Sequence, residues 1–169
     1  SAFRDFTETH KLPAPRLVRQ KAGQAVDLER MNFPLLVKPV DSFSGRGVTK
    51  VHRPQDLQPA IDEALGSSRA SEAVIEEFVE GGLHSHSAYV RDQNIVFDAF
   101  VDEYCTVYPY QVNCSNHPSK LSASQTESFR AAMLRLIKAL QISDGLLHTQ
   151  FIINDDQFWI IECMRRCPG

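Results

Sequence analysis

Apolar residues recur at three- and four-residue intervals over one long segment in the second half of the chain, which predicts a helix over 124–141. Ser124 and Glu127 have the spacing of a capping box at its start. Elsewhere the apolar runs are short and are separated by polar turns, which is typical of a domain that mixes helices with strands. The predicted buried face of the helix consists of Phe129, Met133, Leu136, Ile137 and Leu140.

Strand patterns precede and follow this helix. Segments 84–91 and 94–101 alternate apolar and polar residues, segments 145–153 and 157–163 are mainly apolar runs, and each pair is joined by a short polar turn. Two antiparallel hairpins are therefore predicted. The stretch 104–122, rich in Tyr, Asn, Pro and Cys, is longer than an ordinary connection and is a candidate lid or substrate loop.

Gln150 and Glu162 interrupt the apolar runs of the second hairpin. Polar groups held in such runs tend to face a site or a partner.

The pattern in the first half of the chain predicts shorter elements. These are a helix within 1–11, an extended segment at 16–20, a helical turn at 27–32, strands at 33–38 and 48–51, a helix from 53 to about 65, and a strand at 73–79.

The segment from Phe33 to Val51 carries the clearest chemistry. An apolar run ends at Lys38, where a charge is costly unless it meets an anionic partner. A loop rich in glycine and serine follows, and such a loop lets backbone N–H groups approach an anion closely. A phosphate is the expected ligand, although Gly and Ser also form plain hairpin turns. The loop positions are Ser42, Ser44, Gly45, Gly47 and Val48.

Two common phosphate-binding motifs are excluded by spacing. A P-loop ends in Gly-Lys-Ser/Thr and opens a helix, and a dinucleotide fold needs GxGxxG before a helix. Here Gly47 is followed by Val48, Thr49 and Lys50, and the loop leads into a predicted strand.

Composition narrows the class of protein. With 169 residues and 43% hydrophobic residues, the chain can bury the core of one domain or two small lobes. The formal charge of −3 gives no basic surface for nucleic acid or anionic membrane. We expect a soluble, cytoplasmic protein, because no apolar run of about 18 residues is present. The chain lacks an initial Met and stops directly after a strand, so we expect an excerpt of a longer protein.

The four cysteines form no CxxC pair, so free thiols are expected. A zinc site that uses Cys114 and His117 is the weaker alternative.

The order of these parts resembles the ATP-grasp superfamily over nearly the whole chain. The parts are the lysine strand with its glycine loop, the strand that leaves as Glu-Glu-Phe-Val-Glu-Gly, the helix, and the hairpin that ends in Ile-Ile-Glu-x-x-x-Arg. The resemblance implies an α+β fold of two small lobes with antiparallel sheets that clasp a nucleotide. We expect the lobes at 1–80 and 81–169.

The resemblance also implies roles for individual residues. Lys38 would contact the phosphates of ATP, and the loop 42–47 would close over them, with Val48 beside it. The adenine would be held by backbone and side-chain groups of the linker Glu76, Glu77, Phe78 and Val79. Each assignment has a structural alternative, because Glu76 and Glu77 could be a solvated strand end and the arginines could pair with surface acids.

At the other end of the chain, Glu162 matches the carboxylate that binds Mg²⁺, with Mn²⁺ as a substitute, and Arg166 matches the arginine that steadies the transferred phosphoryl group. The chain departs from the family where Gln150 replaces a second metal-binding carboxylate and Met164 replaces an asparagine. Both changes weaken a second metal site, because a thioether is a poor ligand for a hard cation.

Three histidines are further candidates. The ribose-binding glutamate of the family would fall near Leu83 or His84, and only His84 could hydrogen-bond a ribose hydroxyl. His84 and His86 share a strand face at a metal-ligand spacing, although ordinary strand residues are the commoner explanation. His148 lies two residues before Gln150 and would share its face, where it could contact phosphate or substrate.

The implied function is an ATP-dependent ligase. Such an enzyme phosphorylates a substrate carboxylate to an acylphosphate, which an amine or similar nucleophile then attacks, and Lys38 and Arg166 would be its catalytic residues. Two alternatives stay open. Gln150 and Met164 favour a degenerate nucleotide-binding sensor or scaffold, and a plain α+β interaction domain would bind no nucleotide.

Overall fold

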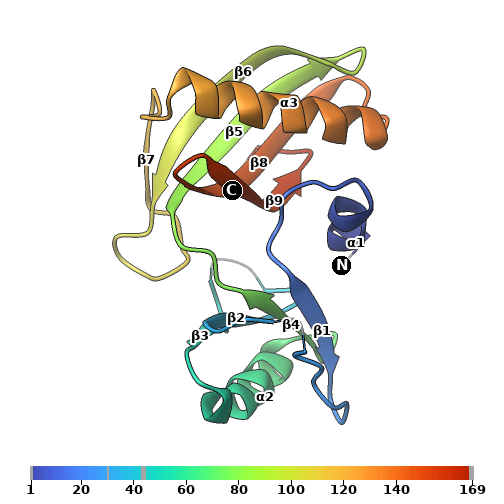
Figure 1. Cartoon of the computed structure of the whole chain (residues 1–169), viewed down its shortest axis with the longest axis vertical. Coiled ribbons are helices and arrows are strands. Elements are labelled where there is room, and N and C mark those ends of the chain that lie inside the picture. Colours follow the sequence, from blue (N-terminus) through green and yellow to red (C-terminus); the bar gives the residue numbers. More distant parts are fainter. Residues whose placement is uncertain (1, 30, 43–44, 168–169) are drawn as a thin grey trace. The chain divides into compact units, whose positions relative to one another are not determined.

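The structure is a computed structural model that describes residues 2–29, 31–42 and 45–167 (Figure 1). It divides into two compact units. Unit 1 contains residues 15–79 and 105–112, and unit 2 contains residues 2–14, 80–104 and the chain from 113 onward. Serine 44, one of the predicted loop residues, lies outside the described residues. The boundaries given above for the two lobes stay a prediction.

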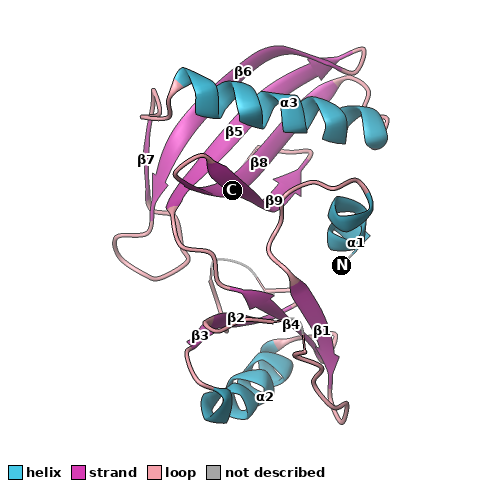
Figure 2. Cartoon of the chain, in the orientation of Figure 1, coloured by secondary structure: helices cyan, strands magenta, loops and turns pink. Residues whose placement is uncertain are grey.

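Unit 1 is a four-stranded antiparallel sheet with one helix (Figure 2). Leu35, Val37 and Ile75 point to the side of the sheet that packs with Ile61 of the helix, and all four are at most 1% exposed. The sheet order is β1-β4-β2-β3. Its elements are β1 Leu17–Lys21, β2 Leu35–Pro39, β3 Thr49–Val51, the 3-10 helix Pro54–Asp56, α2 Leu57–Ser67 and β4 Glu72–Glu77.

Unit 2 is a five-stranded antiparallel sheet in the order β7-β6-β5-β8-β9. The long helix α3 lies along one face of this sheet (Figure 1). Its elements are α1 Ala2–Thr9, β5 Gly82–Arg91, β6 Asn94–Tyr104, β7 Cys114–Asn116, α3 Ala123–Ala139, β8 Gly145–Asn154 and β9 Gln157–Met164.

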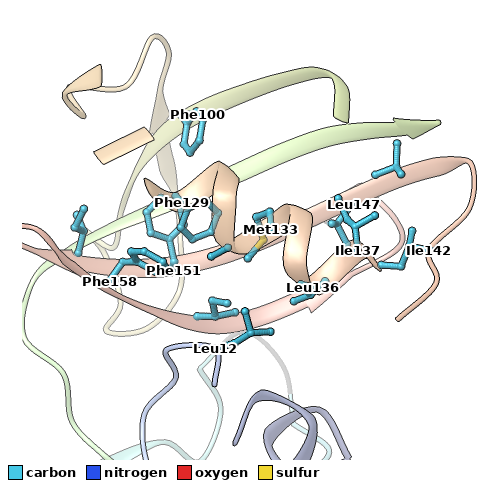
Figure 3. Close-up of a cluster of buried hydrophobic side chains, with 14 residues drawn as sticks. Leu12, Phe100, Phe129, Met133, Leu136, Ile137, Ile142, Leu147, Phe151 and Phe158 are labelled. Carbon is cyan, nitrogen blue, oxygen red and sulfur yellow. The ribbon is translucent and has the colours of Figure 1, made fainter. Parts of the chain in front are cut away.

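The core of unit 2 is built on aromatic rings from α3 and the sheet (Figure 3). The ring of Phe129 stacks on Phe151 with 3.9 Å between centroids and meets the edge of Phe158 at 5.1 Å. Burying one such side chain stabilises a fold by about 1.5–3 kcal/mol. Met133 and Leu136 extend the same contact along the helix.

Most elements expected from the sequence are confirmed, including both hairpins, the helix near the N-terminus and the strands around the glycine loop. The predicted capping box is wrong, because Ser122 and Gln125 form it, two residues earlier than Ser124 and Glu127. Both pairs have the three-residue spacing of a capping box, and the two overlap in the sequence. Leu140 is the C-cap residue of α3 and is 44% exposed, so it does not belong to the buried face.

The segment 27–32 forms no regular helix within its described residues, and a single bond from the Met31 N–H to the Leu28 carbonyl closes a turn. The irregular stretch 104–122 contains the short strand β7. None of the helices in the described part of the chain has the length and hydrophobicity needed to cross a lipid bilayer.

Candidate functional site

The polar face of the unit 1 sheet is the face opposite α2. Strand residues alternate between faces, so Leu36, Lys38, Val74 and Glu76 lie together once their neighbours pack on α2. Lys38 Nζ lies 2.6 Å from Glu76 Oε2. The side chain of Glu76 is 5% exposed and that of Lys38 is 28% exposed. The structure thus joins two predicted site residues in an ion pair, and Lys38 keeps one accessible side.

The chain after β4 is held by hydrogen bonds within unit 1. The Glu77 carboxylate accepts bonds from the backbone N–H and the side-chain amide of Asn32, at 2.9 and 3.0 Å. The Glu77 N–H donates to the Arg16 carbonyl, and the Phe78 N–H donates to the Pro34 carbonyl. By contrast, the Val79 N–H makes no hydrogen bond with any described residue. It is therefore available to a ligand at the predicted adenine position.

The glycine loop requires glycine at both described positions. Gly45 has φ +72° and Gly47 has φ +68°, which is backbone that side chains rarely adopt. A Cβ on Gly45 would lie 2.9 Å from the Pro109 carbonyl oxygen, so segment 105–112 approaches the loop closely within unit 1. The Val48 N–H donates to the Gly45 carbonyl and closes the turn. Ser42 is half-buried at its start.

The polar face of the unit 2 sheet is the face opposite α3, and it carries Glu103, His148, Gln150 and Glu162. Gln150 lies directly across from Glu162, and an irregularity in the strand pairing follows that pair. This irregularity changes the register by one residue, since Phe151 pairs with Ile160. Gln150 Nε2 also donates to Glu103 Oε2 at 2.7 Å.

His148 is buried on this polar face, with 3% of its surface exposed. Its Nδ1 lies 2.8 Å from Ser87 Oγ, and its Nε2 has no hydrogen-bond partner among the described residues. Burial lowers the pKa of His148, although the carboxylates of Glu103 and Glu162 oppose this shift. The imidazole is therefore neutral near pH 7 and has one nitrogen available to a ligand.

His84 and His86 lie on the opposite face, under α3. His84 Nδ1 is 3.0 Å from Asp102, and His86 Nε2 is 2.9 Å from Asp98. Burial lowers the pKa of both imidazoles. Both rings pack against core phenylalanines. The structure thus separates them from His148, and a ribose contact by His84 stays a prediction.

The two arginines near the end of the chain have different surroundings. Arg165 donates to the carbonyls of Leu146 and Asp144, which fixes it to the start of β8. Arg166 is exposed and donates only to the carbonyl of the next residue, Cys167, among the described bonds. Met164 lies across from His148. Arg166 is therefore the arginine that can reach a ligand.

The four cysteines are free thiols. His117 Nδ1 is bonded to the Phe100 carbonyl, and Cys114 is exposed. No group of three or more His, Cys, Asp or Glu side chains among the described residues is arranged to hold a metal ion.

Sequence reasoning missed Glu103 and Ser87. Glu103 is 7% exposed and contacts a predicted metal ligand. Glu103 lies two residues beyond the predicted strand 94–101, and its partner Gln150 is 47 residues away in the chain.

The match that decides the family is to the ATP-grasp domain and covers residues 31–168. The chain belongs to the ATP-grasp family. It is 28% identical over 141 residues to the carbamoyl phosphate synthase large chain of Thermotoga petrophila, covering 82% of this chain and 13% of that protein. It is 30% identical over 149 residues to the D-alanine–D-alanine ligase of Parabacteroides distasonis, covering 83% and 44%. This chain thus spans less than half the length of either relative.

Solved structures agree on the fold. The L-amino acid ligase of Bacillus licheniformis superposes with a TM-score of 0.78 at 21% identity, covering 98% of this ATP-grasp chain and 39% of that one. The D-alanine–D-alanine ligase of Bacillus anthracis, solved with ATP, gives 0.75 at 18% identity, covering 96% and 52%. The predicted α+β fold with antiparallel sheets is confirmed.

Proposed function

We propose that this chain is the nucleotide-binding part of an ATP-dependent ligase, which activates a substrate carboxylate as an acylphosphate for attack by an amine or similar nucleophile. The observation that carries the proposal is the polar face of unit 2. There Gln150 and Glu162 lie opposite each other, beside a buried His148 whose Nε2 has no hydrogen-bond partner in the described part of the chain. Family membership supports the same reaction. A cytoplasmic location belongs to the proposal.

Three parts of unit 1 would contact ATP: the lysine strand, the glycine loop and the segment after β4. The Lys38 ammonium, which pairs with Glu76 and is partly accessible, would also contact a phosphate oxygen. The backbone N–H groups of the glycine loop 42–47 would cover the phosphates, and the Val79 N–H would bind the adenine. Glu76 is an acceptor for an exocyclic amino group, with Glu77 and Phe78 as backbone neighbours.

The residues present fit a divalent cation of the Mg²⁺ or Mn²⁺ type. Such ions take carboxylate and amide oxygens. Glu162 and Gln150 would hold it, because they are paired across β8 and β9 and Glu162 is exposed. When bound, the cation offsets negative charge on the phosphate oxygens.

The chain's own residues then supply the remaining chemistry. Lys38 and Arg166 would offset the charge on the transferred phosphoryl group, and His148 Nε2 would contact phosphate or the acylphosphate. None of these three side chains forms a covalent bond with the substrate. The proposed substrates are a small carboxylate and an amine-type acceptor, because relatives and neighbours with the same fold include ligases of amino acids by name.

Calorimetric titration with ATP and with a non-hydrolysable ATP analogue tests the proposal, each with and without Mg²⁺, on wild type and Lys38→Met. We expect Lys38→Met to weaken binding by at least tenfold, because the phosphate contact is lost. We expect Mg²⁺ to tighten binding in wild type but not in Glu162→Gln. Glu127→Gln, an exposed carboxylate on α3, is the matched control.

The outcomes separate the competing functions. Binding that ignores Mg²⁺ would favour a nucleotide sensor without turnover, for which Gln150 and Met164 are the supporting residues. A folded protein that binds no nucleotide at all would sink the proposed function.

A further inference from the structure

Glu103 is a buried carboxylate on the polar face of unit 2. It lies near the end of β6, across from Ser115 of β7, and is 7% exposed. A buried carboxylate is costly unless it accepts hydrogen bonds. Glu103 Oε2 accepts a hydrogen bond of 2.7 Å from Nε2 of Gln150, whose side chain reaches across β5 from β8.

This hydrogen bond determines the orientation of the Gln150 side-chain amide. A carboxylate only accepts hydrogen bonds, so the amide must direct its NH₂ group toward Glu103. The amide oxygen diverges from the nitrogen by about 120° in any planar carboxamide. It therefore points away from Glu103. Without Glu103, the nearly symmetric amide could present either its oxygen or its NH₂ group to a ligand.

The orientation matters because a glutamine stands where a charged ligand would be expected. An amide oxygen binds a hard cation, whereas an NH₂ group repels it. Gln150 is paired across β8 and β9 with Glu162, whose exposed carboxylate is the other proposed cation ligand. Glu103 also adds a second negative charge to this face. His148 lies two residues before Gln150 on β8 and therefore shares this face.

We propose that Glu103 is a positioning residue, which holds the Gln150 carboxamide with its oxygen presented to a divalent cation bound by Glu162. This inference rests on the proposed function. Glu103 thereby orients the neutral Gln150 side chain as an oxygen ligand. Its own carboxylate, on β6, also provides the negative charge that Gln150 lacks.

The test compares the affinity for a non-hydrolysable ATP analogue with Mn²⁺ and with EDTA, measured by calorimetry. The ratio of the two dissociation constants is the metal-dependent gain in affinity. We expect Glu103→Ala to reduce this gain about tenfold or more, as for other outer-shell partners of metal ligands. The affinity in EDTA should stay within about twofold, because nucleotide contacts to other residues persist. Glu127→Ala, which removes an exposed carboxylate from α3, should keep the wild-type gain.

A double variant that exchanges the two residues tests whether Glu103 orients Gln150 or only stabilises the fold. In Glu103→Gln with Gln150→Glu, the amide and carboxylate exchange strands, so the hydrogen bond and the net charge can both be kept. We expect this double variant to recover at least the wild-type gain, while Glu103→Ala does not. If both variants only lost unfolding free energy, their metal-dependent gains in affinity would not differ in this way.

Each result decides between the two proposals. If wild type shows a metal-dependent gain that Glu162→Gln removes, but Glu103→Ala retains the full gain, the positioning role is wrong and the proposed function stands. A double variant no better than Glu103→Ala would also overturn the positioning role. If wild type shows no metal-dependent gain, both proposals fail.

Discussion

The polar faces of the two sheets differ in how their charged and polar groups are satisfied. In unit 1, Lys38 and Glu76 offset each other at 2.6 Å. In unit 2, His148 Nε2 is buried without a partner among the described residues, and Glu162 is exposed. A ligand at the first face must compete with an existing ion pair, whereas a ligand at the second supplies a missing partner. Ligand binding should therefore change the two faces unequally.

The helix-covered faces differ as well. Below α3, unit 2 stacks the rings of Phe129 and Phe151, whereas below α2 unit 1 packs only aliphatic residues among its buried core positions, such as Leu35 and Ile61. A core of large rings loses more when one is removed, because neighbours refill a large cavity poorly. We expect the stability of unit 2 to depend more on single side chains.

The largest predicted effect comes from Phe129→Ala, which removes a ring with no exposed surface. We expect a loss of about 3–5 kcal/mol in the free energy of unfolding of unit 2, because contacts to Phe151 and Phe158 disappear together. Urea unfolding with hydrogen exchange measures it, and the loss of protection should fall on β5 and β8. Ile61→Val in α2 should cost only about 0.5–1.5 kcal/mol. A loss below about 1 kcal/mol for Phe129→Ala would refute the difference between the cores.

The ion pair of unit 1 comes next. Lys38→Met leaves the buried Glu76 carboxylate without its lysine, so we expect a loss of about 1–3 kcal/mol in unfolding free energy. Glu76→Gln should cost less, because the partly exposed Lys38 can turn toward water. A double-mutant cycle in urea measures the coupling of the two. Equal losses for both single variants would show that the burial of Glu76 does not matter.

Local patterns in the sequence predicted the fold well. Alternation and helical periodicity act between neighbouring residues, so both hairpins and α3 could be located from spacing alone. The capping box was misplaced because Ser122-x-x-Gln125 and Ser124-x-x-Glu127 overlap. The helix begins at Ala123, so Ser122 is its N-cap residue and Ser124 lies inside its first turn.

The candidate site was less predictable. Lys38, Gln150 and Glu162 could be chosen from their place in apolar runs, but their partners could not. Glu76 meets Lys38 across 38 residues, and Glu103 meets Gln150 across 47. Such contacts depend on strand order and register. His84 and His148 looked similar in the sequence, yet they lie on opposite faces of one sheet.

Acid should weaken unit 2 through its buried histidines. Burial lowers the pKa of His86, although Asp98 opposes the shift. The unfolded chain therefore binds a proton first as the pH falls below about 6.5, and the unfolding free energy should drop by up to about 1.4 kcal/mol per pH unit for one such histidine. The lowered pKa of Asp98 acts only nearer pH 4 and below. Urea unfolding between pH 7.5 and 5.0 should show a smaller slope for His86→Asn, and an unchanged slope would contradict the assignment.

The smallest predicted effect distinguishes the two helices by their first turns. Ser122 accepts the Gln125 N–H at 3.2 Å and completes a capping box in α3, whereas Asp56 makes no side-chain cap bond in α2 and binds Arg53 instead. Ser122→Ala should therefore cost about 1 kcal/mol of unfolding free energy, because the Gln125 N–H loses its acceptor. Asp56→Ala and Ser124→Ala should each stay within about 0.5 kcal/mol of wild type. If Ser124→Ala were the costlier serine substitution, the register of the cap would be the one that the sequence first indicated.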